Sequence, residues 1–292
     1  MSTPLVFDRS LVRRRLSRAL SQGYADFLLA RAVEDLEERL SAVLRTFSLA
    51  LDVGTPTPAA AEALRRSGRA ETVIRLSPVP EPGSVLGDEE QLPFFGERFD
   101  LAVSLLALHG VNDLPGALVQ IRRALKADGL FIGALLGGST LTELRQALAQ
   151  AEAEIEGGAS PRVAPFADLR DIGGLLQRAG FALPVTDSDV VRVRYAHAFA
   201  LMQDLRRMGL TNALNDRRKT PLRRATLLRT AEIYAERFGE ADGRIPATFE
   251  IVWLSGWTPH ESQQKPLRPG SAKVRLADAL GVREGGPESN KK

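Results

Sequence analysis

The chain has 292 residues, 44% of them hydrophobic, and its 39 basic and 36 acidic residues give a formal net charge of +3. This length suits one large α/β domain with additions, and the small net charge does not produce the strong positive field of a general nucleic-acid binder. The lack of cysteine excludes disulfides, thiolate nucleophiles and iron–sulfur ligation by this chain.

The amino-terminal segment, 1–47, is predicted to be helical. Five arginines between residues 9 and 18 resemble a mitochondrial transit peptide, but Asp8 and the long helical pattern that follows weaken this interpretation. No stretch reaches the roughly 20 apolar residues of a membrane span, and no secretory signal is recognisable, so we expect a cytoplasmic protein. Apolar residues recur at helical spacing from 24 to 44, which predicts either a capping helix or a lid over a cofactor cleft.

Residues 49–54 predict a buried strand that enters a tight turn. Nucleotide-binding α/β proteins carry a glycine-rich loop at this position, because glycine lets the backbone approach the cofactor closely. Here Gly54 is followed by Thr-Pro-Thr-Pro at 55–58, and a helix is predicted from Pro58 to Arg66. The scaffold therefore indicates a cofactor site, whereas the loop departs from the usual one.

The second strand, 72–76, is followed by an unusual connection. Such folds commonly place an acid there to accept the ribose hydroxyls, but this chain has Ser77, and Glu81 is the nearest carboxylate. Three prolines between residues 78 and 82 exclude a normal helix.

The rest of the chain alternates strands and helices, which predicts a parallel sheet with right-handed crossovers. Strands are expected at 84–86, 99–106, 130–135, 185–193 and 248–254, and helices at 114–125, 141–155, 168–179, 198–208 and 222–238. The residues after His260 are polar and rich in proline, glycine and lysine, so we expect a flexible tail.

Collinear segments over residues 7–271 carry a resemblance to a known family. They include FDRSL at 7–11, LALD at 49–52, DEEQLPF at 88–94, LHGVNDLP at 108–115, DGLFIG at 128–133, TLTELR at 140–145, MQDL at 202–205 and PAT at 246–248. The chain resembles class I S-adenosylmethionine-dependent methyltransferases. More narrowly, it is similar to respiratory complex I assembly factors described as arginine hydroxylases of methyltransferase ancestry.

This resemblance implies a Rossmann-like α/β fold. A mostly parallel seven-stranded sheet would carry helices on both faces, within a methyltransferase-like domain at 48–258 that has a helical insertion at 196–240. The tail would span 259–292. An S-adenosylmethionine pocket would lie at the carboxyl edge of the sheet, formed by Asp52, Gly54, Asp88, Glu89 and Ser104, with Asp88 and Glu89 at the adenine end.

The resemblance also implies a partner, which is an iron–sulfur subunit of complex I modified at an arginine. Any membrane association would be peripheral and would occur through that partner. A charged hydrogen bond contributes roughly 1.5–3 kcal/mol, so the missing loop and ribose contacts weaken the cofactor by roughly 10² to 10⁴. Two alternatives therefore stay open: a noncatalytic assembly chaperone with a decayed pocket, and a carrier-protein or small-molecule methyltransferase related to biotin synthesis.

Other candidate chemistry is limited. His109, after the fourth strand, is a candidate catalytic base or a structural histidine. No histidine and carboxylate are spaced for an iron site, and the acidic run at 88–90 is read as a solvated turn rather than a metal site. The basic residues between 206 and 229 form either a solvated helix face or a patch for an acidic protein. Nucleic acid is not favoured, because aromatic residues are not interleaved with the charge.

Overall fold

The computed structural model describes residues 5–263, and the chain up to Pro259 forms one compact unit. Residues 264–292 of the predicted tail lie outside the described part. A seven-stranded sheet has the order β3-β2-β1-β4-β5-β7-β6. Its strands are β1 (Phe47–Val53), β2 (Ala70–Ser77), β3 (Val85–Leu86), β4 (Phe99–Leu105), β5 (Leu125–Leu136), β6 (Ala182–Tyr195) and β7 (Ile245–Trp257). Strands β1 to β5 pair in parallel and β7 runs antiparallel to both neighbours, which confirms the predicted mostly parallel sheet.

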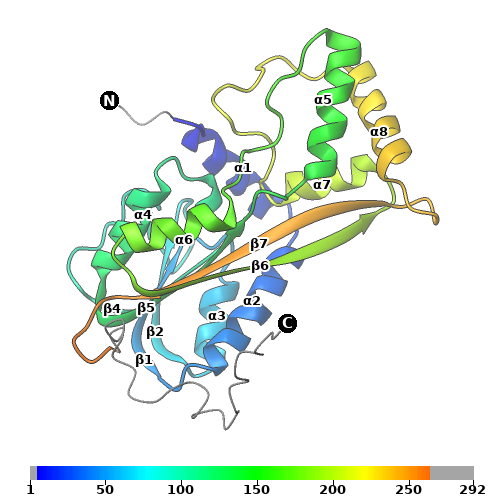
Figure 1. The fold of residues 1–292 in the computed structure, drawn as a ribbon. Coiled ribbons are helices and arrows are strands. Elements are labelled where there is room, and N and C mark those ends of the chain that lie inside the picture. Colours follow the sequence, from blue (N-terminus) through cyan, green and yellow to red (C-terminus); the bar gives the residue numbers. More distant parts are fainter. Residues whose placement is uncertain (1–4, 264–292) are drawn as a thin grey trace, which may run out of the picture. The chain divides into compact units, whose positions relative to one another are not determined.

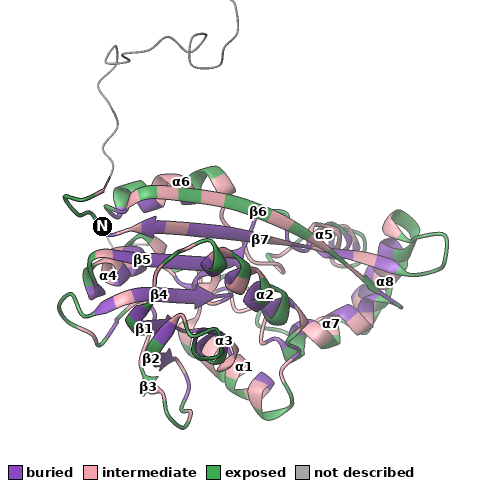
Figure 2. Ribbon diagram, turned by 90° about the horizontal axis from the view of Figure 1, so that it is seen from below, coloured by how far each residue is buried: buried purple, intermediate pink, exposed green. Residues whose placement is uncertain are grey.

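Helices cover both faces of the sheet, as predicted (Figure 1). On one face lie α2 (Phe27–Ser41) and α3 (Ala59–Arg66), and on the other lie α4 (Leu114–Ala124) and α6 (Leu169–Arg178). Alternate residues of β4 serve the two layers, because Leu101 and Val103 join the α2 side whereas Ala102 joins the α4 side. Figure 2 shows β4, β5 and β7 largely buried and β6 as the more exposed edge.

A helical insertion separates the last two strands. It contains α7 (Ala198–Arg207) and α8 (Arg224–Phe238), and α8 packs against α5 (Thr142–Glu156). Strands β6 and β7 pair from Ala182 opposite Trp257 to Tyr195 opposite Ile245, so they reach from the sheet to these helices (Figure 1). Both strands are longer than predicted, because their pairing continues beyond the predicted residues at both ends.

Helix α1 (Arg9–Ser21) lies beside the insertion and starts where the Asp8 carboxylate accepts a hydrogen bond from the Leu11 amide. Its approach is fixed by a β-bridge between Phe7 and Leu214 and by an ion pair between Asp8 and Arg217. Ala19 is the one residue of α1 that is fully buried. Polar contacts therefore hold α1 in place more than apolar packing does.

Candidate functional site

The loop after β1 is folded down onto the carboxyl edge of the sheet. Gly54 has a φ of +73° and donates its amide hydrogen to Leu76 O at 2.9 Å. The buried Thr55 hydroxyl accepts a hydrogen bond from the Leu105 amide at 3.1 Å. Pro56 then faces the cleft. The Thr-Pro-Thr-Pro segment thus fills space above β1 instead of leaving backbone amides free for a ligand.

A buried arginine on β2 reinforces this loop. The Arg75 Nε donates to the Asp52 carboxylate at 3.0 Å, its Nη1 pairs with Glu81 at 2.5 Å, and its Nη2 donates to Thr55 O at 2.8 Å. Asp52 and Arg75 stand opposite each other in the β1–β2 register. Burial raises the pKa of Asp52 to about 6, although the charge of Arg75 opposes the rise. The Arg75 guanidinium thus links the end of β1, the loop that follows it and the connection after β2.

Two arginines of α1 neutralise the acidic turn after β3. Arg9 pairs with Asp88 at 2.8 Å and also with Glu89, and Arg13 pairs with Asp88. Burial pulls the pKa of Asp88 up, but the Glu90 amide and Arg9 outweigh it and lower the pKa to about 2. Burial raises the pKa of Glu89, whose side chain is 4% exposed, despite the charge of Arg9. The predicted solvated turn is instead a largely buried ion-pair network.

The space left at this edge is small. A cavity of about 70 Å³ is bounded by Arg9, Gly54, Pro56, Glu89 and His109. A Cβ atom at Gly54 would lie 2.5 Å from Glu89 Oε1, so the glutamate side chain already rests against the glycine. Binding sites for small molecules and cofactors usually measure about 300–1,000 Å³. The small cavity alone is therefore smaller than such a site in this arrangement.

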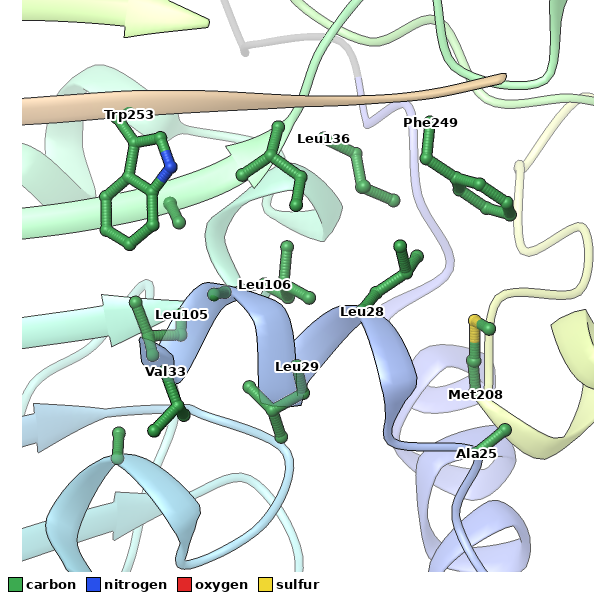
Figure 3. Packing of buried hydrophobic residues seen from close by; sticks show 14 of the residues in the cluster. Ala25, Leu28, Leu29, Val33, Leu105, Leu106, Leu136, Met208, Phe249 and Trp253 are labelled. Carbon is green, nitrogen blue, oxygen red and sulfur yellow. The ribbon is translucent and has the colours of Figure 1, made fainter. Parts of the chain in front are cut away.

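Apolar side chains from α2 and the sheet close the other wall of this cavity. Leu28 points from α2 toward the sheet, where Leu106 and Leu136 lie, and Met208 follows α7 nearby (Figure 3). All four residues are buried. Helix α2 therefore packs on the sheet and contributes Leu28 to the wall of the small cavity, whereas a role as a lid over a cofactor stays a prediction.

A second cavity, of about 340 Å³, lies between the sheet and the helical insertion. We call it the chamber. Its walls are mainly apolar and include Leu136, Leu144, Phe166, Met202, Leu205, Leu222 and Leu227. The chamber and the small cavity share six lining residues, which are Val12, His109, Gly110, Leu136, Gly209 and Leu210. The two spaces are therefore neighbours along one wall.

His109 stands at the boundary between the two cavities, on the short 3-10 turn η1 (Leu108–Gly110). Its ring contacts Phe166 edge-on with centroids 5.8 Å apart, and its buried Nδ1 has no hydrogen-bond partner. Burial and the charge of Arg9 lower its pKa to about 4. The imidazole is therefore neutral near pH 7, in the protonation state that a general base needs.

The structure brings together only part of the predicted set. Gly54, Glu89 and His109 line the small cavity, and Asp88 lies one ion pair away. Ser104 is buried behind them, where its hydroxyl donates to Val53 O at 2.7 Å. Asp52 is engaged by Arg75 and lines neither cavity. The cofactor role of these residues stays a prediction.

The sequence pattern did not reveal three arginines that shape the site. Arg75 interrupts an apolar strand, and a buried charge of that kind requires an acid partner. Arg9 and Arg13 belong to the arginine-rich amino-terminal segment, whose composition resembles that of a transit peptide. The spacing of four between them places both on one side of a helix, and this pattern could have predicted that they contact the same acidic segment.

Several of the predicted basic residues of the insertion form ion pairs. Arg217 pairs with Asp8, Arg218 with Glu156, and Arg229 with Glu154 at 2.7 Å. Within residues 5–263, no group of three or more histidine, cysteine or acidic side chains is arranged to hold a metal ion. Over the same residues, no helix is both long and apolar enough to cross a membrane.

Comparisons with known proteins give the family. Residues 51–133 match the family model described as a methyltransferase domain. The chain is 44% identical to the mitochondrial arginine-hydroxylase NDUFAF5 of Danio rerio, over 94% of this chain and 89% of that protein. It is 43% identical to the Homo sapiens protein of the same name, over 94% of this chain and 83% of that one. The chain belongs to the NDUFAF5 family of class I methyltransferase-fold proteins.

Two further comparisons place the NDUFAF5 family among its relatives. A malonyl-[acyl-carrier protein] O-methyltransferase of Halorhodospira halophila is 33% identical over 94% of this chain and 96% of its own length. The crystal structure of the YcgJ protein from Bacillus subtilis has a TM-score of 0.52 at 15% identity, and covers 79% of this chain and 99% of that one. The structural likeness supports the fold, and the sequence identities support the narrower family.

Proposed function

We propose that this chain modifies an arginine side chain of a protein during assembly of respiratory complex I, with an iron–sulfur subunit as the partner. The observation that carries the proposal is the 44% identity to an arginine-hydroxylase over 94% of the chain, which includes both the sheet and the helical insertion around the chamber. The complex I step and the iron–sulfur partner rest on the family resemblance. The NDUFAF5 relatives are named mitochondrial, whereas the sequence of this chain predicts a cytoplasmic location. The cytoplasmic location is therefore part of the proposal.

The geometry supports a buried target side chain. The chamber lies between the sheet and the insertion and reaches His109, whose neutral imidazole can accept a proton or a hydrogen bond from the bound side chain. The apolar walls exclude water and suit the methylene groups of a long side chain. The chain's own residues thus bind and orient the target.

S-adenosylmethionine remains a predicted ligand rather than a working part of this arrangement. Its entry requires the Arg9 side chain to leave Asp88 and Glu89, so that the cleft widens from about 70 Å³. Calorimetric titration of the full chain with S-adenosylmethionine tests this ligand. Binding at micromolar concentration that Asp88→Ala abolishes supports the predicted pose, whereas no heat at high ligand concentration excludes it.

The small volume of the cleft also favours a second candidate, a noncatalytic assembly chaperone. A deletion strain complemented with the wild-type chain separates the two candidates. Assembled complex I is measured on native gels, and arginine modification is measured by mass spectrometry of its iron–sulfur subunits. We expect the deletion to lower complex I and to remove a hydroxyl or methyl group from one arginine.

The other outcomes of this experiment are equally informative. Loss of complex I with every arginine unchanged would identify the chaperone, and normal complex I would refute both candidates. Methyl transfer to a malonyl-carrier protein by the purified chain would instead favour the carrier-protein alternative, which the relative in Halorhodospira halophila motivates.

A further inference from the structure

The two neighbouring cavities differ in charge in a way that bears on an arginine ligand. The chamber lining includes Arg162 but no acid, and the small cavity includes Arg9 and Arg13. Among the described residues that line either cavity, Glu89 is the one carboxylate. A guanidinium that enters through the chamber therefore has one acid as its ion-pair partner, and it lies past His109.

Glu89 already holds a guanidinium. Arg9 Nη2 pairs with Glu89, and Arg9 Nη1 donates to Gly110 O at 2.9 Å. The Arg9 side chain is 13% exposed, and its buried Nε has no hydrogen-bond partner. Arg9 thus shows which ligand chemistry this position accepts, while it leaves one of its own donors unsatisfied. An unsatisfied buried donor costs free energy, so Arg9 does not meet all of its own hydrogen-bonding requirements at this position.

Glu89 needs another cation as its partner whenever the Arg9 side chain leaves it. Its side chain is 4% exposed and lies against Gly54, and a buried carboxylate without a partner is strongly unfavourable. The neutral His109 beside it does not repel an incoming positive charge. These features describe a site in which one guanidinium replaces another.

We propose that Glu89 is the residue that recognises the guanidinium of an arginine substrate, and that Arg9 occupies its place until the substrate arrives. This rests on the proposed function, because it takes arginine as the target. The aliphatic part of the substrate side chain lies in the chamber, its guanidinium passes His109, and Glu89 exchanges Arg9 for it. Glu89 is then a specificity-determining residue rather than part of an adenine site.

Binding of a defined probe tests this proposal. The probe is Nα-acetyl-arginine methylamide, its neutral match is the citrulline compound, and both are titrated into the full chain by calorimetry. Removing the internal occupant with Arg9→Met should tighten binding of the arginine compound at least tenfold. The double variant Arg9→Met, Glu89→Gln should lose this gain, and the citrulline compound should bind weakly to every variant.

Arg13→Met provides a matched control. It also removes an α1 arginine, but one that pairs with Asp88 and not with Glu89, so it should give no gain. If Arg9→Met does not fold, Arg9→Lys keeps a charge near Glu89 with a shorter reach, and a smaller gain is expected. Thermal unfolding of each variant reports whether it is folded.

Two results would overturn the proposal. One is equal affinity for the arginine compound in wild type, Arg9→Met or Arg9→Lys, and the double variant. The other is a gain from Arg13→Met that equals the gain from the Arg9 substitution. If the binding test fails but the deletion strain loses complex I, only the role of Glu89 is refuted. If the deletion strain has normal complex I, the proposed function itself is refuted.

Discussion

The two cavities on either side of His109 differ in how much of their space is filled and in the side chains that fill it. The small cavity is filled by charged side chains of the chain itself, which leave about 70 Å³, whereas the chamber keeps about 340 Å³ within mainly apolar walls. Filling one side with ion pairs makes its residues interdependent, because each buried charge needs its partner. Truncating a side chain in the apolar walls of the chamber is expected to lower the stability of the protein more gradually. We therefore expect the small cavity to be the rigid, closed end of this region and the chamber to be its adaptable, open end.

The largest expected effect lies at the closed end. Arg75→Met should lower the free energy of unfolding by about 3–5 kcal/mol, because it leaves Asp52 buried without its partner. Urea unfolding measures the change. The control is Arg66→Met, which breaks an ion pair whose arginine is 66% exposed, and it should cost less than about 1 kcal/mol. Equal effects of the two substitutions would mean that the network carries no special stability.

Leucine truncations on the two sides should sharpen the same contrast. Leu28→Ala removes a side chain that is 3% exposed beside the small cavity, and it should cost about 2–5 kcal/mol. Leu227→Ala removes a half-buried side chain at the chamber wall, and it should cost about 1 kcal/mol or less. Both values come from denaturant unfolding. A larger loss at Leu227 would show that the chamber is the tightly packed side.

A further expected effect is a pH dependence from His109. The native imidazole titrates at about 4 whereas the unfolded one titrates near 6.5, so the unfolded chain binds the proton first as the pH falls. Stability from this group is therefore complete above about pH 6.5 and is lost toward pH 4, by about 2 kcal/mol at about pH 5 and about 3 kcal/mol in all.

His109→Gln should flatten this part of the stability curve, which urea unfolding at about pH 7 and about pH 5 measures. The control is His197→Asn, because His197 is exposed and an asparagine can keep its capping hydrogen bond to Ala200. An unchanged slope in His109→Gln would place the imidazole in water rather than between the cavities.

Local patterns predicted the elements well because those patterns arise from near neighbours. The fourth strand was predicted at 99–106 and β4 spans Phe99–Leu105, and the helix predicted at 114–125 is α4, Leu114–Ala124. Boundaries were less accurate at β6, predicted at 185–193 but observed at Ala182–Tyr195. There the partner strand β7 extends the pairing beyond the apolar residues that gave the signal.

The site was harder to predict than the fold because its contacts join distant segments. Gly54, Glu89 and His109 could be placed near one edge, since the carboxyl ends of parallel strands meet there. The pair between Arg9 and Glu89 spans 80 residues, and the pair between Arg75 and Asp52 depends on the register of two strands. Neither register nor the docking of α1 follows from residue spacing alone.

The attachment of Arg9 to the same chain as Glu89 has a consequence for specificity. An attached ligand is present at an effective concentration on the order of millimolar or more, so an external guanidinium competes with it at every encounter. The measured affinity is then the intrinsic affinity reduced by the fraction of molecules in which Glu89 is free. Under the proposed exchange, free arginine would compete with Arg9 through its guanidinium alone, whereas a partner protein that also contacts α1 would change that fraction. Selection of a protein-bound arginine over the free amino acid would follow from this competition alone.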